Sequence, residues 1–209
     1  AKVTTALQEA STAAAIEALL YDVAGYVLEQ TDCQISKHQD SAYGYGSFCL
    51  VLSVAHPAFM DTLLGCLNKE CVYTVPRYVS KLVGQSDQDA LRAQGYRPTG
   101  DDPNQLESED EYTVRMQGAL ALYAAMLQTN AERGGGRAGV DMAQAWRWLA
   151  RMGNLKPRRI TAAMLFTFLE LAGFRLNQVF GRQFAKYVRF VRADLLGRLP
   201  PTTPHAARG

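Results

Sequence analysis

The sequence predicts an all-α fold, an irregular helical solenoid or bundle of about seven or eight antiparallel helices. Residues 112–127, 145–152 and 160–173 are apolar runs with helical spacing that follow one another closely along the chain. No stretch shows a convincing strand pattern, and no internal repeat is evident. Apolar residues make up 48% of the 209 residues, which is ample for one large core.

The first part of the chain is expected to form three helices. Residues 2–31 place Ala13, Ile16, Leu19, Val23 and Val27 at helical spacing. Residues 42–54 are apolar nearly all round, so we expect this helix to be central. Pro57 suits the first position of a third helix ending near Glu70, because the first N–H of a helix needs no partner within the helix.

Between residues 71 and 111 the pattern predicts irregular structure around one short helix. Residues 71–76 read as extended, and Ser86 is placed to cap a helix over 86–94. Residues 95–107 form an acidic loop rich in glycine and proline. Ser108 and Glu111 then make a capping box that begins the next helix.

The remaining helices should carry most of the core. The helix that begins near residue 108 has no charge from 116 to 131, and Asp141 is placed to cap another helix. A final pair is expected over about 160–174 and about 176–198. We therefore predict one helical domain over 1–198 and a Pro-rich, disordered or truncated tail over 199–209. The side chains expected to be buried are Met116, Leu120, Tyr123, Leu127, Trp146, Leu149, Leu165, Phe168 and Leu171.

Charge is spread unevenly, although the net charge is only +2. Residues 151–209 hold eleven Lys and Arg and two acids, so the C-terminal part should present a positive surface. Arg182, Lys186 and Arg189 lie at helical spacing, opposite an apolar stripe. This basic face is either simply solvated or a contact for an acidic partner or a phosphate. The apolar stripe consists of Phe184, Val188, Val191 and Leu195.

Trp146 and Trp148 lie about 200° apart around a helix, so one core face cannot hold both. Trp146 groups with Met142 and Leu149, which indicates the core. Trp148 groups with Met152, and two interpretations remain open for it. It either belongs to a second core layer or is an exposed anchor for a partner peptide.

No group of residues in this sequence supports catalysis or metal binding, so we expect a regulator or scaffold rather than an enzyme. His38, His56 and His205 are scattered, and the four cysteines form no CxxC pair. Residues 41–60 are uncharged but interrupted by Gly, Ser, His and Pro, which argues against a membrane span. No sequence-specific nucleic-acid motif is present. The clustered acids are interpreted as capping and solvated residues: Glu107, Glu109, Asp110 and Glu111.

Seven short sequence segments occur in an order that is similar to that of one known family. They are AHP at 55–57, LNKECVYTVP at 67–76, GY at 95–96, EYTVRMQG at 111–118, LYAA at 122–125, AWRWLAR at 145–151 and LFTFLE at 165–170. Over roughly residues 20–198 the chain resembles the C-terminal domain of the GLE-one mRNA export factor family, nuclear-pore-associated activators of a DEAD-box ATPase.

The resemblance implies a HEAT-like helical domain, similar to the middle domain of a translation-initiation scaffold. It implies that the protein binds and stimulates a DEAD-box RNA-dependent ATPase at the cytoplasmic face of the nuclear pore complex, with a presence in cytoplasm and nucleus. A short segment of an FG nucleoporin is the second implied partner, and we expect it on the C-terminal half near Trp148, Met152 and Phe184. The alternative is a helical scaffold for another RNA helicase in translation or RNA processing.

The resemblance also implies inositol hexakisphosphate as a cofactor that bridges domain and ATPase in fungi. Lys69, Arg97 and Arg115 keep the basic character of the fungal site. Fungal Lys or Arg positions are replaced here by Gly25, Cys66 and Glu70. Each lost charge-assisted contact removes roughly 1.5–3 kcal/mol, so we expect a weakened site.

Overall fold

The structure is a computed structural model that describes residues 5, 12–100, 102, 104–132 and 140–200. Its described part contains eight α-helices and no sheet, so the all-α prediction is confirmed. An isolated antiparallel bridge joins Pro98 and Leu106. The helices are α2 (Ala13–Gln30), α3 (Ala42–Ala55), α4 (Ala58–Glu70), α5 (Asp87–Ala93), α6 (Glu109–Glu132), α7 (Met142–Asn154), α8 (Thr161–Phe180) and α9 (Arg182–Phe190).

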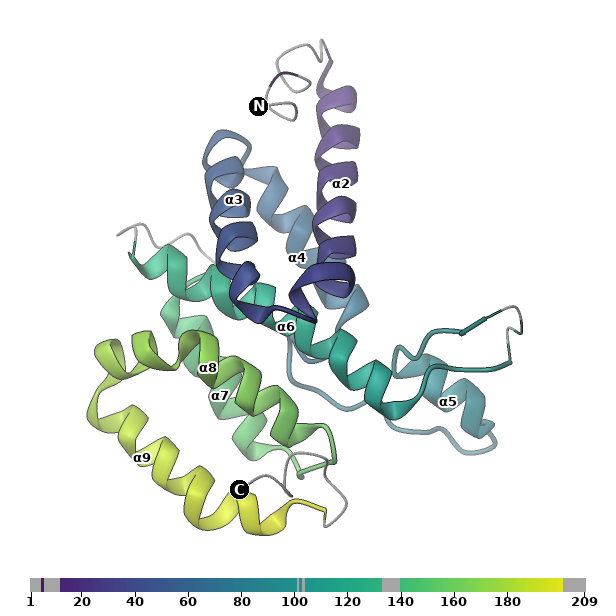
Figure 1. Cartoon of the computed structure of the whole chain (residues 1–209), viewed down its shortest axis with the longest axis vertical. Coiled ribbons are helices and arrows are strands. Elements are labelled where there is room, and N and C mark those ends of the chain that lie inside the picture. The colour runs from purple at the N-terminus through teal and green to yellow at the C-terminus, as the bar shows by residue number, and fades with distance from the viewer. Residues whose placement is uncertain (1–4, 6–11, 101, 103, 133–139, 201–209) are drawn as a thin grey trace.

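Helix α6 crosses the middle of the molecule and is shared by two groups of helices (Figure 1). One group is α2, α3 and α4, and the other is α7, α8 and α9. Gly46 lets α3 approach α6 closely, because a Cβ there would lie 3.2 Å from the Met126 backbone nitrogen. The uncharged stretch of α6 is buried on nearly every side, as its sequence predicted.

The expected core residues are buried with one exception. The exception is Trp146, which is half-buried because it packs at the edge of the core, with its ring centroid 4.9 Å from that of Phe180. Trp148 is instead 2% exposed and stacks on Phe168 at 3.9 Å between centroids. The prediction for Trp146 is therefore wrong, and Trp148 belongs to the second core layer.

A segment over residues 72–83 that is neither helix nor strand ties the two helix groups together. Residues 72–75 form turns and bends, so the prediction of extended structure over 71–76 is wrong there. The Trp148 indole Nε1 donates to the Tyr73 carbonyl at 2.7 Å. Farther along, the Tyr78 and Thr161 hydroxyls lie 3.0 Å apart, and the Arg158 guanidinium sits 3.9 Å over the Tyr78 ring. The segment, which starts at the end of α4, is therefore fixed to α7 and α8.

The predicted helix starts are confirmed at three caps, whereas the predicted boundary between α8 and α9 is wrong. Ser86, Asp141 and the Ser108–Glu111 box cap their helices as predicted. Helix α8 continues past residue 174 to Phe180, because the break lies at Gly181, whose φ of +43° favours glycine. Pro57 precedes α4 as its cap rather than opening it. Most of the expected helix before residue 12 and the tail after 200 lie outside the described residues.

Candidate functional site

A cavity of about 270 Å³ lies between α2, α4, α6 and the loop after α5. It brings together all six positions that the sequence singled out for an inositol phosphate site. Three are the basic residues Lys69, Arg97 and Arg115, and three are the replaced positions Gly25, Cys66 and Glu70. We call this cavity the paired pocket.

The end of α2 shapes one wall of the paired pocket. The helix widens there into a π-helical turn, η1 (Thr31–Ile35), which packs against α6. The approach is so close that a Cβ on Gly118 would overlap the Thr31 carbonyl oxygen. Glycine at 118 therefore allows this turn to bring Asp32 to the pocket.

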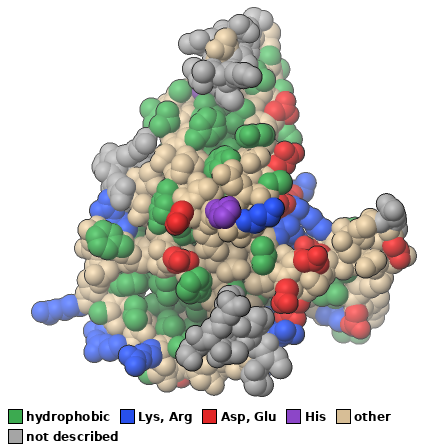
Figure 2. Space-filling model, viewed as in Figure 1, with side chains coloured by type: hydrophobic (Ala, Val, Ile, Leu, Met, Phe, Trp, Pro, Cys, Tyr) green, Lys and Arg blue, Asp and Glu red, His purple; other side chains and the backbone are tan. Residues whose placement is uncertain are grey.

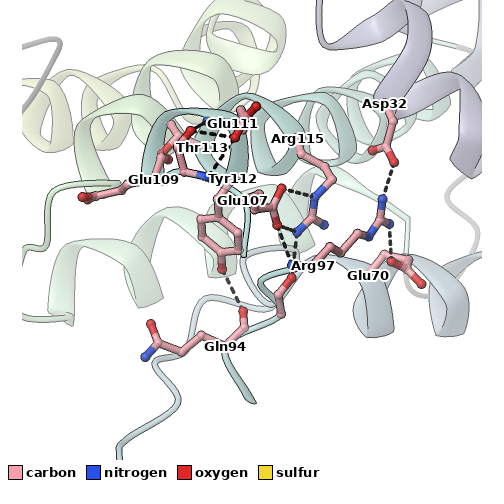
Figure 3. Close-up of polar contacts among 12 residues, drawn as sticks. Asp32, Glu70, Gln94, Arg97, Glu107, Glu109, Glu111, Tyr112, Thr113 and Arg115 are labelled. Atoms are coloured by element: carbon pink, nitrogen blue, oxygen red, sulfur yellow. Dashed lines mark hydrogen bonds and ion pairs between the residues drawn. The ribbon is translucent and has the colours of Figure 1, made fainter. Parts of the chain in front are cut away.

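Arg97 connects two walls of the paired pocket through its guanidinium (Figure 3). Nη1 donates to Asp32 Oδ2 and Nη2 donates to Glu70 Oε2, both at 2.6 Å. Burial lowers the pKa of Arg97, but the hydrogen bonds to Glu70 and Asp32 outweigh it, so the pKa is raised. Although its side chain is exposed, Arg97 is held on both sides and is therefore already paired with the protein's own carboxylates.

Arg115 is similarly occupied, deeper in the fold. Its Nε donates to Glu107 Oε2 at 3.1 Å, its Nη2 forms an ion pair with Glu107 Oε1, and Nη2 also donates to the Gly95 carbonyl at 2.7 Å. Glu107 accepts a further hydrogen bond from the Arg97 backbone N–H at 2.9 Å. Glu107 is therefore a buried ion-pair partner, and its interpretation as a solvated loop residue is wrong.

The charges lining the paired pocket balance. Lys69, which is exposed and without an ion pair among the described residues, joins Arg97 and Arg115 on the positive side. Glu29, Asp32 and Glu70 supply as many carboxylates. A polyphosphate entering this cavity would meet these carboxylates and would have to displace the existing ion pairs of Arg97. The residues present therefore do not fit tight binding of inositol hexakisphosphate.

The three residues expected to bind a nucleoporin do not form an exposed groove. Trp148 and Met152 are buried, and Phe184 is 9% exposed. The interpretation of Trp148 as an exposed anchor is wrong, because its ring lies against Phe168 and its indole N–H is used internally. The exposed aromatic side chains of α8 are instead Phe166 and Phe174, at 55% and 72%.

The basic face of α9 exists as predicted. Arg182, Lys186 and Arg189 are exposed, and no ion pair within the described residues engages them. Lys and Arg side chains gather over this part of the molecule in Figure 2. The apolar stripe differs by one position, because Val188 is 42% exposed and Tyr187 packs inward beside Phe190.

The described residues contain neither a metal-binding cluster nor a helix that could span a membrane. No group of three or more His, Cys, Asp or Glu side chains lies close enough there to hold a metal ion. None of the described helices has the length and apolar character needed to cross a bilayer.

Comparison with known proteins gives one consistent answer. A family described as GLE1-like protein matches residues 1–192. The mouse mRNA export factor GLE1 is 29% identical over 192 residues, covering 90% of this chain and 27% of the mouse protein. The zebrafish mRNA export factor GLE1 is 30% identical over 188 residues, covering 88% of this chain and 26% of that protein. The chain thus spans about a quarter of the length of these relatives.

A solved structure shares the fold. It is the complex of a Saccharomyces cerevisiae Dbp5 C-terminal domain bound to Gle1 and IP6. The TM-score is 0.85 at 20% identity, and the match covers 99% of this chain and 71% of the solved one. Together with the family match over residues 1–192, this shows that the chain belongs to the GLE1-like protein family.

Proposed function

We propose that this domain is a non-catalytic regulator that binds and stimulates a DEAD-box RNA-dependent ATPase during mRNA export, at the cytoplasmic face of the nuclear pore complex. The observation that carries the proposal is the fold match over 99% of the chain to a structure described as Dbp5 bound to Gle1. The relatives named mRNA export factor support the same process.

The arrangement around the paired pocket supports a binding role. Arg97 joins η1 to α4, while Glu107 joins the loop after α5 to α6. These ties hold four segments distant in sequence in one rigid surface. A surface that is already ordered loses little conformational entropy when a partner docks, which favours binding. We propose that this binding holds the two lobes of the ATPase partly open.

Inositol hexakisphosphate has a reduced part in this proposal. The solved yeast complex contains IP6, as its description states. In this chain Asp32 and Glu70 hold Arg97, so the surface is ordered by internal ion pairs. We propose micromolar or weaker binding of this anion, and stimulation of the ATPase that depends little on it.

The C-terminal half is the proposed site for two further contacts. An FG-nucleoporin segment docks along α8 near Phe174, with Phe184 at the edge, rather than on Trp148 or Met152. An acidic partner contacts the α9 face of Arg182, Lys186 and Arg189. Phe174→Ser should weaken binding of the nucleoporin segment. It should not unfold the domain, because Phe174 is 72% exposed. Unchanged binding by the folded variant would rule out this placement.

An ATPase assay tests the main proposal. RNA-stimulated turnover of the cognate export helicase is measured with and without the domain at low salt, where charged contacts are strongest. Increased turnover supports the proposal, and unchanged turnover contradicts it. Stimulation of a translation or RNA-processing helicase, with none of the export helicase, would favour the alternative scaffold function.

A further inference from the structure

A second polar cavity, of about 320 Å³, lies on the other side of α4 from the paired pocket. Its polar side chains come from α4, the segment over residues 72–83, α6 and α7: Asn68, Thr74, Tyr123, Gln144, Arg147 and Arg151. Among the described residues, no carboxylate lines it. We call it the arginine pocket.

The two arginines of this pocket are available for a ligand. Arg147 and Arg151 lie one turn apart on the same face of α7, and both are exposed. Neither has an ion pair within the part of the chain that the structure describes. The nearby acid Asp141 already caps α7, where its Oδ1 accepts from the Gln144 N–H at 2.8 Å.

The other polar groups of the arginine pocket are arranged as donors. The Thr74 hydroxyl lies within donating distance of two acceptors, Asn68 Oδ1 at 2.7 Å and the Cys71 carbonyl oxygen at 2.8 Å. The Asn68 amide nitrogen makes no hydrogen bond among the described residues and can donate. The Tyr123 side chain is 8% exposed and has no hydrogen bond among the described residues. Burial raises the pKa of Tyr123 to about 12, so its hydroxyl remains protonated and can donate at neutral pH.

We propose that the arginine pocket binds a carboxylate or phosphoryl group carried by an acidic peptide segment of a partner protein. Two guanidinium groups, a phenol and amide N–H groups match the acceptor oxygens of such a group. Leu64 and Val75 supply an apolar edge for the neighbouring peptide side chain. The proposal does not rest on the ATPase function, because it concerns a different face of α4.

A peptide suits this pocket better than RNA does. Sequence-tolerant RNA binding uses exposed aromatic rings for base stacking. The aromatic residues here are Trp148 and Tyr123, and both are buried, with Trp148 already stacked on Phe168. The cavity is also a compact hollow with two cations rather than a long basic groove.

Fluorescence anisotropy tests the proposal with the whole chain. The probe is a short fluorescein-labelled Glu-rich peptide, in unmodified form and with a central phosphoserine. We expect binding of at least one form, and the pair Arg147→Glu and Arg151→Glu should weaken it by about tenfold or more. Tyr123→Phe should weaken binding by about two- to fivefold, because it removes one donor and keeps the ring.

A matched charge reversal separates this pocket from general electrostatic attraction. Lys37→Glu, after η1, makes the same charge change at an exposed basic residue that lies outside the pocket and outside the α9 face. We expect peptide affinity to stay within about twofold for this control, with far-UV circular dichroism showing that all variants are folded. An equal loss in Lys37→Glu, or no binding of either peptide, would overturn the proposal. Tighter binding of a uridine-rich RNA or of inorganic phosphate than of the peptides would also overturn it.

Discussion

The two polar pockets on either side of α4 contain similar basic residues and differ in their acids. In the paired pocket, Asp32 and Glu70 hold Arg97, and Glu107 holds Arg115. In the arginine pocket, no carboxylate of the described residues lines the cavity, and Arg147 and Arg151 are exposed. The comparison teaches that basic residues alone do not define an anion site, because carboxylates of the same chain can occupy them first.

The largest effect is expected from removing the buried partner of Arg115. Both side chains of the Glu107–Arg115 pair are about one-tenth exposed, so Glu107→Ala leaves a nearly buried cation unpaired. We expect a loss of about 3–5 kcal/mol in unfolding free energy, measured by urea denaturation. Asp87→Ala breaks the exposed Lys81–Asp87 pair and should leave the unfolding free energy nearly unchanged. Equal effects would mean that burial does not distinguish the two pairs.

Gly118→Ala should have the next largest effect. The added Cβ would collide with the Thr31 carbonyl, so η1 must move away from α6 and take Asp32 with it. We expect a loss of about 3 kcal/mol in unfolding free energy. Gly65→Ala in α4 is the control, because a Cβ there meets nothing within 4 Å. That change should stabilise the protein by about 0.5–1 kcal/mol, so a neutral Gly118→Ala would contradict the close packing.

Alkaline pH should destabilise the end of α4, which both pockets border. Burial is the main cause that raises the pKa of Cys71 from 9.0 to about 11. The protonated Cys71 thiol makes its full contribution to the unfolding free energy below its unfolded-state pKa. That contribution is lost as the pH rises towards the folded-state pKa. Comparison of Cys71→Ala with the parent from pH 8 to pH 11 should show about 2 kcal/mol less alkaline loss in the variant. Parallel pH profiles would contradict this assignment.

The smallest predicted effect concerns anion affinity in the paired pocket. Glu70→Lys removes a carboxylate and adds a basic group beside Lys69 and Arg97. We expect calorimetry to show about tenfold or more tighter binding of inositol hexakisphosphate than in the parent. Asp61→Lys, an exposed change elsewhere on α4, should leave the affinity nearly unchanged. Nanomolar binding by the parent would show that the internal carboxylates do not oppose the anion.

The sequence predicted the helices well where local signals decide them. The uncharged run of α6 and the Ser86, Asp141 and Ser108 caps were recognisable because periodicity and capping depend on neighbouring residues. The break before α9 was misplaced, since residues 175 and 176 are ordinary helix formers and Gly181 alone marks it. Which of the two tryptophans is fully buried depends on the helices that pack against α7, and the local sequence does not contain that information.

The sequence predicted a weakened anion site, but it did not predict the carboxylates that pair with the two arginines of the paired pocket. The resemblance supplied six positions, and the fold brings all six to one cavity. Asp32 and Glu107 were missed as partners because Asp32 is 65 residues from Arg97, and Glu107 reaches Arg115 only after the loop folds back. An acid four residues or fewer away could have been paired from sequence, whereas these pairs depend on three-dimensional proximity.

The segment over residues 72–83 has a consequence for cooperativity. It leaves α4, which packs with α2, and is then fixed to α7 and α8 by Trp148, Thr161 and Arg158. Loss of either helix group would strip this segment of its partners and expose one side of α6. The two groups should therefore unfold together in a single transition, and damage on one side of the molecule should be felt on the other.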